Sequence, residues 1–204
     1  MKTRYAVLLV ILFIVIGAAL YGWSMIRRGF SAHDEPSAVE ALVARTVRSL
    51  AVPAAYDSLK NPLPPAPENI REGLEHFADH CAVCHANDGS GNTTFGKGMY
   101  PKPPDMRAAT TQNKTDGEIY YTIEHGIRLS AMPAFGEKGR TDDETTWKLV
   151  LFIRHMPKLT PAQLRQMERL NPKTRAELEE EQEAERFLRG EDSPPSKSTK
   201  HNKH

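Results

Sequence analysis

The only two cysteines of the chain lie within one short stretch, Cys81-Ala82-Val83-Cys84-His85. This C-x-x-C-H pattern is the attachment signature of c-type haem. Two thiols at this spacing can add to the two vinyl groups of a haem as thioethers. The next residue, His85, then lies on the same face and can ligate the iron. The pattern therefore predicts a chain that folds around one covalently bound haem c.

Other uses of a cysteine pair fit this sequence less well. A thioredoxin-like dithiol expects a β-α-β context, and no strand alternation is present. A zinc site would need a second pair of ligands, and the chain contains no further cysteine. Two cysteines also exclude a framework of several disulfides.

An apolar run near the N-terminus, Tyr5 to Ile26, extends for 22 residues without a charged side chain. At 1.5 Å per residue a helix of this length spans about 33 Å, which is enough to cross the hydrocarbon core of a bilayer. Tyr21 and Trp23 fall where an interfacial aromatic belt is expected. The run predicts a single-pass membrane anchor.

A cleaved signal peptide is the alternative interpretation. Lys2 and Arg4 would form its basic region, and small residues at 17–19 offer a cleavage site. The apolar region of a signal peptide is usually about 7–15 residues, which is shorter than this run, so a retained anchor is favoured. Haem is attached to such motifs outside the bacterial cytoplasmic membrane. Residues after Arg28 are therefore expected in the periplasm, with the anchor in the inner membrane.

The charge of the chain is nearly balanced, with 27 Lys and Arg against 26 Asp and Glu. A nucleic-acid-binding surface would normally need a strong basic excess, so nucleic acid is not an expected partner. The segment 67–157 is mildly acidic, with 13 acidic and 10 basic residues, whereas the C-terminal tail is dense in both signs.

Four regions follow from these patterns: an anchor (1–28), an amphipathic helix with a proline-rich linker (29–66), a compact helical domain (67–157), and a charged, partly disordered tail (158–204). In the second region, Asp34 to Ala51 is predicted to be helical with one apolar face. Packing on the next domain is the favoured role for that face, and contact with a partner or a membrane surface is the alternative.

Helix signals dominate the compact domain and continue into the tail. Two capping boxes are predicted, Thr115 to Glu118 and Thr141 to Glu144. A long loop rich in Gly, Pro and Thr, 87–113, is unusual in a compact domain unless something fills the space beside it. Residues 190–204 are expected to be disordered. The predicted helices span 67–82, 115–126, 141–157, 160–170 and 173–188.

Residues 67–157 resemble a class I cytochrome c domain. Gly73 and Phe77 match the family's small-then-aromatic pair on the first helix, and Leu149 and Phe152 match its apolar-then-aromatic pair on the last helix. The resemblance implies an all-α fold in which these two helices cross around one haem, here preceded by a transmembrane helix.

The resemblance also implies the remaining haem contacts. Met132, in the segment 130–136, matches the family's methionine loop and would be the second axial ligand, which favours ferrous iron. Pro104 matches the family proline whose carbonyl accepts a hydrogen bond from Nδ1 of His85 and fixes its ring.

Other ligand arrangements stay open. Met99 and Met106 are rival methionines, although both are better suited to lining the pocket, and Met156 is expected in the core. His125 would give a bis-histidine site, and an open sixth position is the remaining possibility. Predicted cofactor-binding residues are Cys81, Cys84, His85, Met132 and Pro104, with His85 and Met132 on the metal.

A six-coordinate His/Met haem has no open position for a substrate and moves single electrons. The sequence thus predicts a membrane-tethered monohaem carrier, or the haem subunit of a respiratory complex. Its redox partner would be a quinol-oxidising complex, a terminal oxidase or a periplasmic dehydrogenase. The alternative is a haem subunit with its own catalysis, as a peroxidase or in oxidation of a sulfur compound or alcohol. A haem sensor would need a signalling domain, which the sequence does not suggest.

Overall fold

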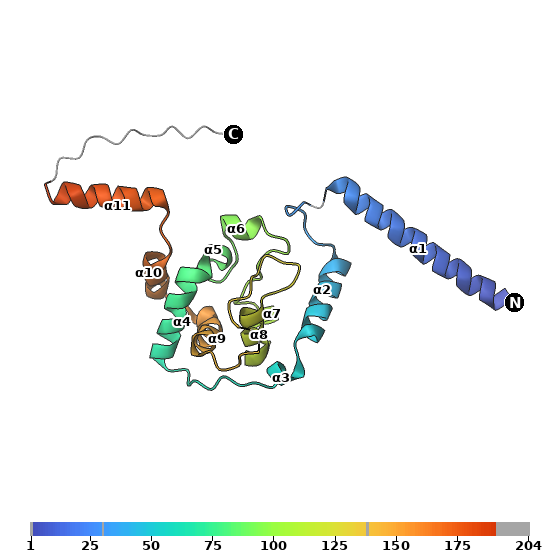
Figure 1. The fold of residues 1–204 in the computed structure, drawn as a ribbon, viewed down its shortest axis with the longest axis horizontal. Coiled ribbons are helices and arrows are strands. Elements are labelled where there is room, and N and C mark those ends of the chain that lie inside the picture. The colour runs from blue at the N-terminus through green and yellow to red at the C-terminus, as the bar shows by residue number, and fades with distance from the viewer. Residues whose placement is uncertain (1, 30, 138, 191–204) are drawn as a thin grey trace.

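The computed structural model describes residues 2–29, 31–137 and 139–190, and within these ranges the regular structure is entirely helical (Figure 1). The expected all-α class is confirmed. In chain order the elements are α1 (Lys2–Arg28), α2 (Ala38–Ala51), α3 (Ala54–Asp57), α4 (Pro67–His80), α5 (Ala82–His85), α6 (Thr94–Lys97), α7 (Ala109–Gln112), α8 (Asp116–His125), α9 (Glu144–His155), the 3₁₀ turn η1 (Met156–Lys158), α10 (Pro161–Leu170) and α11 (Arg175–Leu188).

The crossing of α4 and α9 forms the centre of the fold. A side chain at Gly73 would overlap the backbone carbonyl of Lys148, so only glycine allows the two helices to approach this closely. One turn further on, the rings of Phe77 and Phe152 lie 5.2 Å apart between their centroids. The two residue pairs that carried the family resemblance therefore meet at this crossing, as predicted.

Segments on both sides of 67–157 belong to the same packed unit. Tyr56, Leu59 and Leu63 pack against the buried core from α3 and the extended chain that follows it. The Asn61 amide donates a 2.8 Å hydrogen bond to the Trp147 carbonyl. At the other end, Met167 of α10 is fully buried. The packed domain therefore extends from about residue 54 to residue 170.

Most predicted helix starts are correct. Both hydrogen bonds of the Thr115 capping box are present at α8, and equivalent boxes open α10 and α11. The box predicted at Thr141 is wrong: α9 is capped by Asp143, which accepts from the Thr146 N–H. The Thr141 carbonyl instead accepts from the indole of Trp147 at 3.1 Å, and this contact keeps Thr141 outside the helix.

The long loop between α5 and α8 contains two single helical turns, α6 and α7, that the sequence signals did not reveal. Gly91 has φ +71°, and a Cβ there would meet the Pro103 carbonyl oxygen at 2.7 Å. Gln112 donates to the carbonyls of Met106 (2.7 Å) and Ile153 (2.9 Å). These bonds hold the loop against α9.

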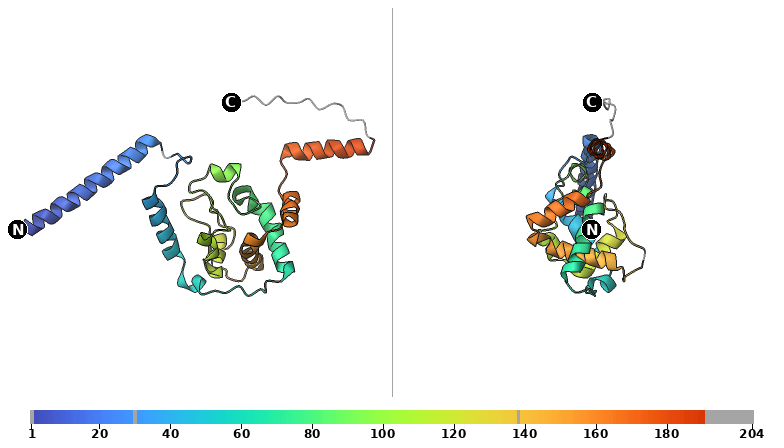
Figure 2. Two further views of the ribbon diagram at one scale, coloured as in Figure 1. Left: turned by 180° about the vertical axis from the view of Figure 1, so that it is seen from behind. Right: turned by 90° about the vertical axis from the view of Figure 1, so that its left-hand side faces the viewer.

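Two helices project from opposite sides of the packed domain (Figure 2). Within α1, the stretch Arg4–Arg28 contains 18 consecutive residues with a mean hydropathy of 2.6 and none of them buried, so it is long and apolar enough to cross a membrane. The charged helix α11 also has no buried residue. Residues 191–204, which include nearly all of the segment predicted to be disordered, lie outside the described residues.

Candidate haem site

The two cysteines and the histidine are placed by a single helical turn. Cys81 ends α4 and begins α5, and its carbonyl accepts from the N–H groups of Cys84 (3.2 Å) and His85 (3.0 Å). Residues at positions i, i+3 and i+4 of a helix share one face. The C-x-x-C-H motif is therefore folded with both thiols and the imidazole on one side.

A small apolar cavity brings the predicted ligands together. Met132 follows His85 by 47 residues in the sequence, yet both side chains line this cavity together with Cys81. Its other walls are Phe77, Met106, Ile123, Phe135, Leu149 and Ile153. Cys84 does not line the cavity but lies one helical turn from Cys81. An imidazole nitrogen and a thioether sulfur inside apolar walls, with a pair of thiols beside them, form the set of groups that a c-type haem requires. The residues present fit that group.

Burial sets the protonation of this motif. It lowers the pKa of His85 to about 4, so the imidazole is neutral at physiological pH and keeps a lone pair for a metal. Burial, with a smaller contribution from Cys84, raises the pKa of Cys81 to about 12. Burial also raises the pKa of Cys84. Reactive dithiols have lowered thiol pKa values, so these shifts disfavour a thioredoxin-like role.

The hydrogen bond expected between His85 and Pro104 is not present. The Nδ1 atom of His85 is buried without a hydrogen-bond partner. Pro104 is exposed to solvent, while the preceding carbonyl, of Pro103, lies against Gly91. The structure therefore does not support the expected contact, and the role of Pro104 stays a prediction.

The methionine loop is shaped by its own backbone contacts. Met132 donates its N–H to the Ser130 hydroxyl at 3.1 Å, and its carbonyl accepts from the N–H of Ile127 at 3.1 Å. At Gly126, φ is +63° and a Cβ would lie 2.7 Å from the Met132 carbonyl oxygen. Only glycine tolerates both conditions, so Gly126 allows the loop to fold back over the end of α8.

The rival ligands differ in whether they line the cavity that contains His85. Met106 lines the cavity, whereas Met99 does not, and Met156 is buried in the core with 1% of its surface exposed. His125 points elsewhere: its ring stacks on Tyr121 with 4.3 Å between centroids. Of the rivals, Met106 alone shares the cavity with His85.

Several site residues were missed by the sequence reasoning. Ile123 and Ile153 form walls of the cavity, and their helical spacing within α8 and α9 could have indicated this. Glu124 is buried beside the methionine loop with 1% of its surface exposed. A lone glutamate in an amphipathic helix carries no sequence signal that distinguishes it from a solvated one.

Comparison with known proteins agrees with this site. Residues 68–153 match the family described as cytochrome C oxidase, cbb3-type, subunit III. The chain is also similar to the cbb3-type cytochrome c oxidase subunit FixP of Rhizobium meliloti (strain 1021), with 29% identity over 108 residues. That match covers 50% of this chain and 33% of the relative, so the aligned part spans about a third of the relative's length.

The all-helical fold, the cavity shared by the predicted ligands, the apolar N-terminal helix and both sequence matches lead to one conclusion. The chain is similar to membrane-anchored class I c-type cytochromes, and this similarity supports haem c as its cofactor.

Proposed function

We propose that this protein carries one haem c, ligated by His85 and Met132, and transfers single electrons on the periplasmic side of the membrane. It acts either as a tethered carrier or as the haem subunit of a respiratory complex. The observation that supports this most directly is that His85 and Met132, far apart in sequence, line one apolar cavity. The single C-x-x-C-H motif accounts for one haem.

Each residue has a distinct task in this proposal. Cys81 and Cys84 would hold the group covalently, so that it is not lost during repeated oxidation and reduction. His85, kept neutral by its burial, and Met132 would bind its iron. The haem supplies a one-electron ferric/ferrous couple when bound.

The apolar walls contribute by excluding water. Phe77, Leu149 and Ile153 are nearly fully buried. When the iron gains or loses one electron, few water molecules around it need to reorient, and this favours fast electron transfer.

The similarity to subunits named for cbb3-type cytochrome c oxidases favours a terminal oxidase complex as the electron acceptor. A quinol-oxidising complex or a periplasmic dehydrogenase would be the donor. Because the match covers a third of the relative, assembly into such a complex is a proposal for this chain.

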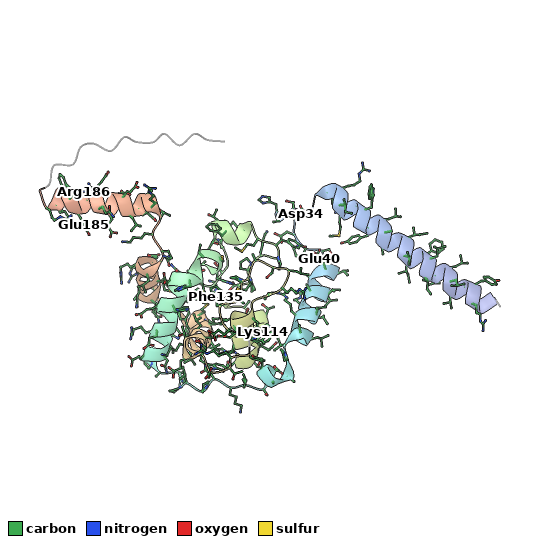
Figure 3. All side chains as sticks on the ribbon, viewed as in Figure 1. Asp34, Glu40, Lys114, Phe135, Glu185 and Arg186 are labelled. Carbon is green, nitrogen blue, oxygen red and sulfur yellow. The ribbon has the colours of Figure 1, made fainter. Side chains whose placement is uncertain are left out.

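Electrons are proposed to leave through the rim of the methionine loop. Phe135, labelled in Figure 3, lines the cavity and also has 46% of its surface exposed. Ala134 beside it is exposed as well. A small apolar rim suits a transient redox encounter. An Ala134→Lys variant should slow electron transfer to the isolated acceptor while the spectrum and midpoint potential stay unchanged.

Carbon monoxide tests the choice between electron transfer and catalysis. A haem with two protein ligands should show no spectral change when the reduced protein is exposed to the gas. Ready binding would favour the alternative, a haem subunit with its own peroxidase or oxidase chemistry. Orientation is tested separately: external protease should digest the packed domain in spheroplasts, and protection from it would place this domain in the cytoplasm.

A further inference from the structure

The helix α2 presents an apolar face that nothing in the described part of the chain covers. None of its residues is buried. The sequence favoured packing of this face on the next domain, and that prediction is wrong. The exposed fractions along the face are Val39 72%, Leu42 59%, Val43 54%, Val47 59% and Leu50 80%.

The opposite edge of α2 faces the packed domain. Glu40 accepts a hydrogen bond from the Tyr100 hydroxyl, and just before the helix Glu35 pairs with Lys102. Glu40 and Ala41 are half-buried, whereas the rest of the helix is exposed. At 100° per residue Ala41 lies opposite the apolar face and Glu40 lies at its edge, so these contacts with the domain leave the apolar face exposed.

The short connection to the membrane anchor limits how far α2 can lie from the lipid surface. α1 ends at Arg28 and α2 begins at Ala38, so nine residues join them. Nine residues span at most about 30 Å when fully extended. Turns at Gly29 and at Asp34, whose N–H groups bond to Ile26 and Ser31, shorten this reach. Since α1 crosses the bilayer, α2 stays close to the lipid surface.

We propose that α2 lies on the lipid surface with its apolar face in the membrane, and that it holds the cytochrome domain against the bilayer from which α1 emerges. An amphipathic helix with basic residues on its polar side is suited to this position. Arg45 is exposed and can meet lipid phosphates. Every copy is tethered to its own membrane, so the lipid is present at a high effective concentration, unlike a second copy.

This arrangement would restrict the cytochrome domain to a few orientations. The domain is joined to α2 at both ends of that helix: through Glu40 and Tyr100 at its beginning, and through α3 directly after it. A helix fixed on the lipid would therefore limit the directions in which the haem rim can face a membrane-bound partner.

A nitroxide label can test this inference on the full-length protein. In the holoprotein both native cysteines form thioethers, so a Val47→Cys or Arg48→Cys variant carries one free thiol. The two positions are neighbours in sequence, but Val47 lies on the apolar face of α2 and Arg48 lies on its polar side. Each labelled, reduced protein is placed in phosphatidylcholine and phosphatidylglycerol vesicles. Collisions of the label with oxygen, which concentrates in lipid, and with a water-soluble nickel chelate are then measured.

The label at position 47 should lose most of its collisions with the nickel chelate and keep those with oxygen, while the label at 48 keeps its collisions with the chelate. Equal exposure of both labels to the chelate would overturn the inference. Protection of position 47 from both reagents would also overturn it and indicate a second copy or another protein. A Leu50→Cys variant repeats the test at the other end of the helix, and covalent haem in each variant shows that the domain has folded.

Discussion

Thr146 on α9 donates a 2.5 Å hydrogen bond to the carboxylate of Glu124 on α8, and both side chains are buried. The second carboxylate oxygen of Glu124 has no partner and lies against Gly136, where a side chain would overlap it. The backbone N–H of Gly136 bonds to the Glu124 carbonyl at 3.1 Å. One buried carboxyl group therefore touches both α9 and the end of the methionine loop.

Removing the Thr146 hydroxyl should destabilise the domain and loosen this loop. In Thr146→Val both carboxylate oxygens of Glu124 would be buried without a partner, which lowers the free energy of unfolding by about 1–3 kcal/mol. Chemical denaturation of the holoprotein measures this loss. Thr145→Val, at the exposed neighbouring position, is the matched control and should change stability by less than about 0.5 kcal/mol. Equal effects of the two changes would contradict the role of the buried pair.

The haem should resist extraction from the wild-type protein. Thioether bonds from Cys81 and Cys84 survive acid and acetone and give haem staining on a denaturing gel. A Cys81→Ala, Cys84→Ala double variant should lose this staining entirely. Clean extraction of haem from the wild-type protein would show that the attachment is not covalent.

The methionine ligand can be recognised by its spectrum. The ferric protein should show the weak far-red band of sulfur-to-iron charge transfer, and Met132→Ala should abolish that band and lower the midpoint potential, since a thioether ligand favours ferrous iron. Met106→Leu tests the rival methionine in the same cavity and should keep the band. Persistence of the band in Met132→Ala, together with its loss in Met106→Leu, would reassign the ligand.

A methyl group at Gly73 should push α4 and α9 apart. The added Cβ would overlap the carbonyl of Lys148, and such overpacking typically costs about 1–3 kcal/mol. Gly73→Ala should therefore lower the midpoint of thermal unfolding. Gly98→Ala, where the nearest atom lies at 3.6 Å and φ is −87°, introduces the same group without a clash. An unchanged midpoint in Gly73→Ala would mean that the helices do not approach as closely as described.

The ion pair between Glu72 and Lys148, at 2.8 Å, joins the same two helices and should make stability depend on pH at both extremes. The hydrogen bond from Lys148 lowers the pKa of Glu72 below its usual 4.5, so its contribution is present above pH 4.5 and is lost as pH falls through the lowered value. The bond from Glu72 raises the pKa of Lys148 above 10.5. That contribution is complete below pH 10.5 and is lost as pH rises through the raised value.

Unfolding measured across pH in wild type and in Glu72→Gln checks this expectation. The variant should show a weaker decline in stability at both ends of the range. Because both groups are partly exposed to solvent, added salt should reduce the difference. Parallel pH profiles for the two proteins would argue against a contribution from the pair.

The sequence alone determined the chemistry and the helical framework of this protein. The C-x-x-C-H spacing places its three side chains on one turn whatever surrounds it, because helix geometry is local. The same is true of the capping box at Thr115 and of the apolar run in α1. Each of these predictions depends on residues only a few positions apart.

Tertiary structure decided everything that depends on contacts between distant residues. Thr141 and Asp143 could each have capped α9, and the bond from the Trp147 indole to the Thr141 carbonyl selected Asp143. The sequence could not separate a buried Glu124 from a solvated one, because burial depends on Thr146 and Gly136 being brought to it. It likewise could not show that the apolar stripe of α2 faces outward: a stripe defines a face, but only packing determines what that face meets.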